Sequence, residues 1–164
     1  MASGWTRQLR RRYLSLGLGE LVAAAVFCGV AATAVGPRLD TDADRFAFWA
    51  ALVPLVVILL QAGVYWLIAR TWLGDGRMPR GVASVYRCFR VVDVVLLAVG
   101  LGGVVAAGPS SPAVLVLVLA VWAFGVAEYV NYFVVRLAYP ARRWLTEVGC
   151  LRTPRLVQDL RVSS

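Results

Sequence analysis

The sequence predicts an all-α polytopic membrane protein with four transmembrane helices in an antiparallel bundle. Two observations lead to this fold class. The 164 residues are 60% hydrophobic and only 16% charged, with a mean hydropathy of +0.74, whereas a soluble domain carries about a quarter charged residues. The hydrophobic residues also gather in four long blocks, and a helix needs about 20 apolar residues to cross a bilayer.

The four blocks give the predicted spans in order, at residues 14–35, 46–69, 91–107 and 113–135. The third block is the shortest. Pro79 suits the first turn of a helix, so this helix can begin earlier and include "GVASVYRCF". The last two spans are joined by the tight turn "GPSSP" and should form an antiparallel hairpin.

The connection between the first two spans, "GPRLDTDADR", contains three alternating aspartates. A calcium loop begins in this way, but the glycine at its sixth position and the glutamate at its twelfth are missing here. A solvated turn in which Asp44 caps the second span is therefore the prediction.

The distribution of the 17 arginines predicts the orientation. Four precede the first span, five lie in or beside the central loop, and six follow the last span, whereas the two other connections hold only Arg38 and Arg45. Cytoplasmic segments carry the excess of positive residues. Both termini and the central loop are therefore expected in the cytoplasm, with the spans in the plasma membrane.

The sequence divides into a transmembrane domain, residues 1–137, and an Arg-rich cytoplasmic tail, residues 138–164. In the tail, Thr153 and Pro154 form a plausible cap and first-turn pair. A short interfacial helix on the inner membrane surface is one interpretation of this segment. A solvated tail is the other.

Polar residues inside the spans are the candidate functional residues. An ionisable group within a span costs on the order of 2.5–3.5 kcal/mol, so it normally faces other helices or a water-filled cavity. Acids in the first, third and fourth spans all fall in the cytoplasmic half, close to arginines at the span ends. We therefore predict one interhelical cluster, whose members are Glu20, Asp93, Glu128, Asn131, Tyr132, Arg90 and Arg136.

This cluster has two main interpretations. It is either a closed clamp that fixes the register of the helices, or a protonatable or cation-binding site open to the cytoplasm. The chain has no histidine, and its three cysteines lack metal-ligand or redox spacing. No catalytic residue, metal site or cofactor is therefore predicted, and a membrane enzyme is the weakest function class.

Two stretches carry a family resemblance. "EYVNYFVVRLAY" in the last span and "YRCFRVVDVVLL" before it resemble small uncharacterised four-span bacterial integral membrane proteins with an E-Y-x-N-Y pattern. The resemblance implies a bacterial inner membrane and a shared role for Glu128, Tyr129, Asn131, Tyr132 and Arg136. It implies no activity.

The predicted function is that of a non-enzymatic accessory or interaction subunit. The alternative is a small proton- or cation-coupled transporter that uses Glu20 and Glu128. The net charge of +8 indicates attraction to anionic inner-leaflet lipid rather than to nucleic acid. The expected partners are therefore the bilayer itself and either another membrane protein or further copies of this chain.

Overall fold

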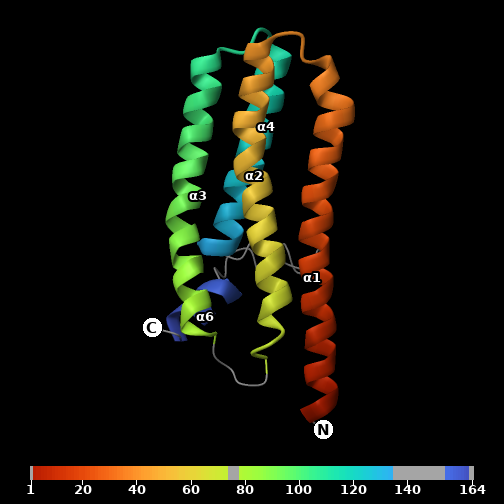
Figure 1. The fold of residues 1–164 in the computed structure, drawn as a ribbon, viewed down its shortest axis with the longest axis vertical. Helices are drawn as coiled ribbons and strands as arrows, with labels where there is room; N and C mark the ends of the chain where they lie inside the picture. Colours follow the sequence, from red (N-terminus) through yellow and green to blue (C-terminus); the bar gives the residue numbers. More distant parts are fainter. Residues whose placement is uncertain (1, 74–77, 135–153, 163–164) are drawn as a thin grey trace, which may run out of the picture.

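The computed structural model describes residues 2–73, 78–134 and 154–162, and within these ranges it contains helices and no strand. The predicted all-α fold of four long helices is confirmed (Figure 1). The helices are α1 (Ala2–Val30), α2 (Asp42–Ala69), α3 (Arg80–Ala107), α4 (Pro112–Phe133) and the short α6 (Arg155–Val162). After α1 the chain continues through a π-helical turn, Ala31–Val35, and a 3₁₀ turn, Gly36–Arg38.

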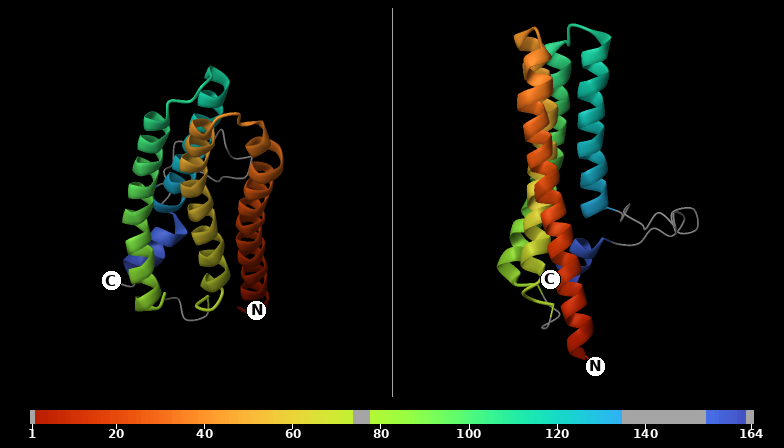
Figure 2. Two further views of the ribbon diagram at one scale, coloured as in Figure 1. Left: turned by 45° about the horizontal axis from the view of Figure 1, so that its top comes forward. Right: turned by 90° about the vertical axis from the view of Figure 1, so that its right-hand side faces the viewer.

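The four long helices alternate in direction, which gives the molecule two distinct ends (Figures 1 and 2). The start of α1, the α2–α3 connection and α6 lie at one end, here named the termini end. The α1–α2 and α3–α4 connections lie at the other, here named the connection end. All four helices are long and apolar enough to cross a membrane.

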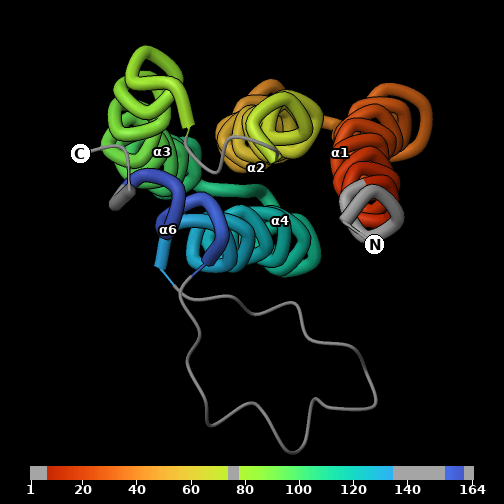
Figure 3. The backbone as a smooth tube through the Cα atoms, turned by 90° about the horizontal axis from the view of Figure 1, so that it is seen from below, coloured from red at the N-terminus to blue at the C-terminus, as the bar shows by residue number. Residues whose placement is uncertain are grey.

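Helix α2 is the centre of the fold. It packs against α1, α3 and α4, and a view along the bundle shows α1, α2 and α3 in a row with α4 on one side of that row (Figure 3). In the most apolar window of each helix, 56% of α2 is buried, against 11%, 22% and 11% for the other three. Three of the four helices therefore turn most of their apolar surface outward.

Each helix begins before its predicted span because hydropathy detects only the apolar centre, whereas α4 ends at Phe133 rather than at residue 135. The third span was predicted at residues 91–107 with an earlier start that includes "GVASVYRCF". This extension is confirmed, since α3 begins at Arg80 with Pro79 as its N-cap. It ends at Ala107 and has Gly108 as its C-cap. The φ of this glycine, +59°, is a left-handed conformation that glycine adopts without strain. Pro79 therefore stands just before the first turn rather than inside it.

Glycines allow α2 to approach two of its neighbours closely. A Cβ atom at Gly17 of α1 would lie 2.9 Å from the carbonyl oxygen of Gly63 in α2. A Cβ atom at Gly100 of α3 would lie 2.5 Å from the carbonyl oxygen of Ala50. Small residues at such crossings are the usual means by which helices pack in lipid, where no hydrophobic force draws them together.

The prediction for Asp44 is wrong, since this residue neither caps α2 nor faces solvent. Thr41 is the N-cap, and its Oγ1 accepts a hydrogen bond of 3.0 Å from the Asp44 amide. The buried Asp44 carboxylate instead accepts bonds of 2.8 and 2.5 Å from the amide and hydroxyl of Ser110. Because threonine already satisfies the free amide of the first turn, the aspartate is available to tie the two connections together.

The tail contains the predicted helix, and α6 packs against α3 and α4 at the termini end. Its side chains Leu156, Asp159 and Leu160 are buried. Thr153, the predicted cap, lies outside the described residues. The helix therefore closes the termini end of the bundle with a mixed apolar and charged face.

Candidate polar site between the helices

A chain of hydrogen bonds joins three helices near the termini end. The Tyr132 hydroxyl on α4 donates to Oε1 of Glu20 on α1, at 2.5 Å. The same hydroxyl accepts a longer bond, 3.4 Å, from Nε1 of Trp66 on α2. A tyrosine hydroxyl both donates and accepts, so Tyr132 can link two partners that have no direct bond to each other.

Glu128 and Asn131 extend this chain along α4. Asn131 lies one turn after Glu128 and hydrogen-bonds its carboxylate, and Glu128 is close enough to Glu20 for the two carboxylates to repel each other. Both acids are half-buried. We name the group formed by Glu20, Trp66, Glu128, Asn131 and Tyr132 the Glu20 cluster.

Side chains join α1 to α4 at the Glu20 cluster and at a second level. The second level is nearer the middle of the bundle, where the rings of Phe27 and Phe124 lie 5.6 Å apart. The row of helices in Figure 3 places α2 between α1 and α3, with α4 to one side. The cluster therefore acts as a polar bridge between helices that are joined mainly through α2.

Asp93 belongs to a separate pair rather than to the Glu20 cluster. Its Oδ1 accepts a 2.9 Å bond from the side-chain Nε2 of Gln61 on α2. The hydroxyl of Tyr86 on α3 donates to the backbone carbonyl oxygen of Gln61 at 3.0 Å. Asp93 is fully buried. Within the described residues, its Oδ2 and Oε1 of Gln61 have no hydrogen-bond partner. The predicted single cluster is thus divided into two by helix α2.

Arg90, one of the two arginines predicted to belong to the cluster, is not the hydrogen-bond partner of Asp93. Arg90 is exposed, and its backbone carbonyl accepts a 3.2 Å bond from the Tyr129 hydroxyl. The Asp93 carboxylate bonds to an amide rather than to this guanidinium. Long arginine side chains reach outward to water from the ends of membrane helices, which accounts for the difference. Arg136 lies outside the described residues.

Asp159 on α6 is a polar residue that the sequence analysis missed. Its Oδ2 accepts bonds from the Tyr65 hydroxyl at 2.9 Å and from Nε1 of Trp72 at 3.3 Å, and its Oδ1 pairs with Nε of Arg155 at 3.1 Å. A signal was present in the sequence, because Asp159 shares one face of a short helix with two leucines. Neither an interfacial helix nor a solvated tail, the two predictions for this segment, includes a contact with α2.

Two adjoining cavities open beside the Glu20 cluster. The smaller, about 90 Å³, is lined by Glu20, Trp66, Asn131 and Tyr132 together with the first residues of α6. The larger, about 240 Å³, lies nearer the termini end; both are lined in part by Leu16, Trp66 and Arg155. Glu20 is therefore at the inner end of a polar space that α6 partly covers.

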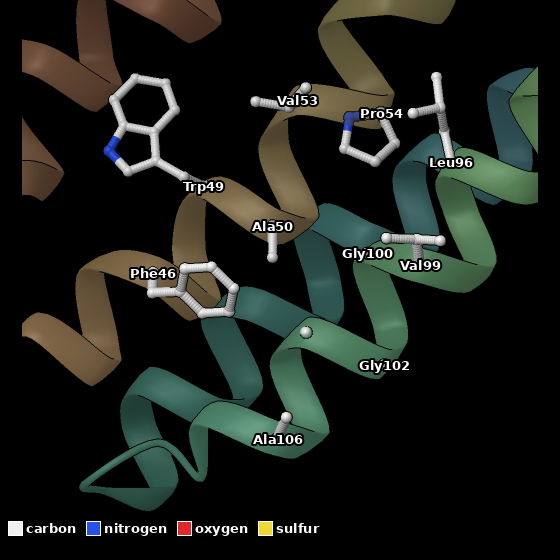
Figure 4. A pocket seen from close by; sticks show the side chains of 11 residues that line it. Phe46, Trp49, Ala50, Val53, Pro54, Leu96, Val99, Gly100, Gly102 and Ala106 are labelled. Atoms are coloured by element: carbon white, nitrogen blue, oxygen red, sulfur yellow. The ribbon is translucent and has the colours of Figure 1, made fainter.

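A third concave surface is apolar and lies on the other side of the molecule. Figure 4 shows the groove of about 540 Å³ between α2 and α3, with Phe46 and Trp49 on one wall and Val99, Gly102 and Ala106 on the other. Phe46 and Trp49 are 59% and 45% exposed. We name this surface the α2–α3 groove.

The fold and these contacts define a class: a helical multi-pass membrane protein whose spans are joined by interhelical polar bonds. Comparison with known proteins gives no match to a protein-family model, to a curated protein or to a solved structure. The class of protein is therefore assigned from the helices and the hydrogen bonds of this chain.

Proposed function

We propose that this chain is a non-enzymatic integral membrane protein that acts as an interaction subunit. In this proposal it assembles side by side with another copy or another membrane protein. The polar groups support this function because their hydrogen bonds join separate parts of the bundle: Glu20 bonds to Tyr132 on α4, Asp93 to Gln61 on α2, and Asp44 to Ser110 in the α3–α4 connection. Such bonds hold a four-helix unit together as a rigid scaffold.

The proposed location is a bacterial plasma membrane with the termini end in the cytoplasm. The excess of arginine in the segments at that end supports this orientation through the positive-inside rule. A cysteine-labelling assay on intact cells tests it. A single cysteine at exposed Asp40, in the connection end, should react with a membrane-impermeant maleimide, and one at exposed Arg11 should not.

The observation that carries the proposed function is open space at three outward glycines. Gly19 and Gly29 on α1 and Gly102 on α3 are exposed, and a Cβ atom added at any of them would meet nothing within 4 Å. At Gly17, Gly63 and Gly100 an added Cβ would clash with the neighbouring helix, whereas at these three it would meet no described residue. Small residues on an outward face allow a further helix to approach closely.

A bulky substitution at Gly102 tests the assembly. In Gly102→Phe the new Cβ meets nothing within 4 Å, and the ring is attached at a residue that lines the α2–α3 groove. The wild type should be extracted from its native membrane in a mild detergent as a complex heavier than the 17.8 kDa monomer. The variant should run as the monomer.

Val105→Phe is the matched control. It adds the same ring on the same helix, at a position that is 73% exposed and does not line the groove, so its complex should persist. A wild type that is monomeric after cross-linking in the native membrane contradicts the proposal. Equal loss of the complex in both variants would exclude the groove as the contact surface.

A second candidate function is a proton- or cation-coupled carrier, and the cavity at Glu20 favours it. Glu20→Gln is a clean test because a glutamine carbonyl can still accept the Tyr132 bond, while the side chain can no longer bind or release a proton. In liposomes with a pH gradient, wild-type protein should move protons or a fluorescent organic cation, and the variant should not. Absence of flux in the wild type would eliminate the carrier.

A further inference from the structure

The larger cavity at the termini end brings two arginines together from distant parts of the sequence. Arg12 lies on α1 and Arg155 begins α6, and both line the same space of about 240 Å³. The rest of the lining combines polar and apolar groups, among them Tyr13, Trp66 and Leu16. A concave basic site of this kind requires α6 in its docked position.

Within the described residues, the two arginines of this cavity keep donors for a further acceptor. Arg155 pairs with Asp159 through Nε, so its two terminal amino groups can still donate to a second acceptor. Arg12 is exposed and forms no ion pair with any acid among the described residues. Two guanidinium groups that face one space favour a doubly coordinated anion, and phosphate matches their planar donor geometry.

We propose that this cavity binds the phosphate of an anionic phospholipid head group, with Arg12 and Arg155 as its ligands. The proposal goes beyond the interaction-subunit function and does not depend on it. Basic pockets between helices at the cytoplasmic side of membrane proteins bind such head groups. The tail thereby contributes half of the charge of the site, which gives α6 a role in lipid recognition.

The surroundings of the cavity favour a lipid over a free phosphate ion. Tyr13 and Trp66 lie edge to face, with ring centroids 5.0 Å apart, and such aromatic groups belong at the head-group level of a bilayer. Leu16 lines the cavity and is itself 36% exposed. An acyl chain can contact this leucine from the bilayer while the head group occupies the cavity.

Native mass spectrometry from a neutral detergent tests the site directly. The protein is mixed with equal amounts of phosphatidylglycerol and phosphatidylcholine, and the ratio of the two bound lipids is measured. Wild type should retain phosphatidylglycerol preferentially. Arg12→Gln should lower the ratio about fivefold, the effect of one basic residue close to an anionic lipid.

Arg11→Gln is the matched control, since it removes the same charge from the adjacent exposed position, which does not line the cavity. Its ratio should equal that of wild type. Arg12 is the residue of choice because its replacement breaks no ion pair among the described residues. An unchanged thermal midpoint verifies that the variant is folded. Arg155→Gln should show a similar loss of preference.

Three results would overturn the proposal. An equal loss in the Arg11 and Arg12 variants would mean that the overall charge of the segment attracts the lipid. A wild type without preference would mean that the anionic head group is not recognised. The third result is displacement of bound phosphatidylglycerol by an equal concentration of soluble glycerol phosphate. The site would then recognise free phosphate esters rather than a lipid in the membrane.

Discussion

The crossing of α2 and α3 can be tested with a pair of glycines two residues apart. In Gly100→Ala the new Cβ would lie 2.5 Å from the Ala50 carbonyl oxygen and 3.1 Å from Cγ of Pro54. In Gly102→Ala the new Cβ would meet nothing within 4 Å. The neighbours at Gly100 are backbone and a proline ring, which cannot rotate away, so the two helices must move apart.

The expected magnitude follows from this geometry. Forcing an extra carbon into a well-packed site costs about 1–3 kcal/mol. Both substitutions exchange glycine for alanine in the same helix, so the change in helix propensity is common to both and cancels in their difference. For a chain of this size, the difference corresponds to a separation of about 2–12 °C between the two unfolding midpoints.

The assay is thermal unfolding of the two purified variants, both as monomers in one strong detergent, followed by the circular dichroism of the helices. Gly100→Ala should unfold at the lower temperature, and Gly102→Ala should remain at or above the wild-type midpoint. Coincident midpoints for the two variants would refute the close α2–α3 crossing. A lower midpoint for Gly102→Ala alone would mean that an outward contact exists at that glycine in the detergent complex.

Three further substitutions test the polar contacts, and two of them have a matched control. Tyr132→Phe should lower the free energy of unfolding by about 0.6–1.7 kcal/mol, the range for interhelical hydrogen bonds in membranes, and Tyr129→Phe should lower it less because its bond is exposed. Asp44→Ala should cost about 1–3 kcal/mol in the same measurement, whereas Asp42→Ala at a fully exposed position should cost little. Asp159→Asn should speed amide hydrogen exchange within α6 and leave the four long helices unchanged; equal exchange in α6 would contradict its docking by this carboxylate.

The candidate site was only partly predictable. Glu20, Glu128 and Tyr132 could be singled out because a polar side chain inside an apolar block is costly, and helical spacing places those of α4 near one another. Asp93 was assigned to the same group because its depth is similar. Depth does not specify direction around the bundle, and α2 lies between Asp93 and Glu20.

Partner identity was the least predictable feature. Charge suggested that arginine would neutralise Asp93, but Gln61 is the group that reaches its carboxylate. Asp44 looked like a cap because it stands at the start of a helix, yet Thr41 holds that position. In both cases a rule based on neighbouring residues in the sequence predicted a chemically suitable residue. The folded structure brings a different residue within hydrogen-bonding distance.

The sequence by itself determined the class of structure, because the cost of exposing backbone groups to hydrocarbon leaves long apolar blocks only the helical conformation. It also determined the number of spans. Only the tertiary structure decided that α2 is central, that the acids form two groups, and that α6 docks beneath the bundle through Asp159. These features depend on which faces of separate helices meet, and that information lies in packing between residues far apart in the chain.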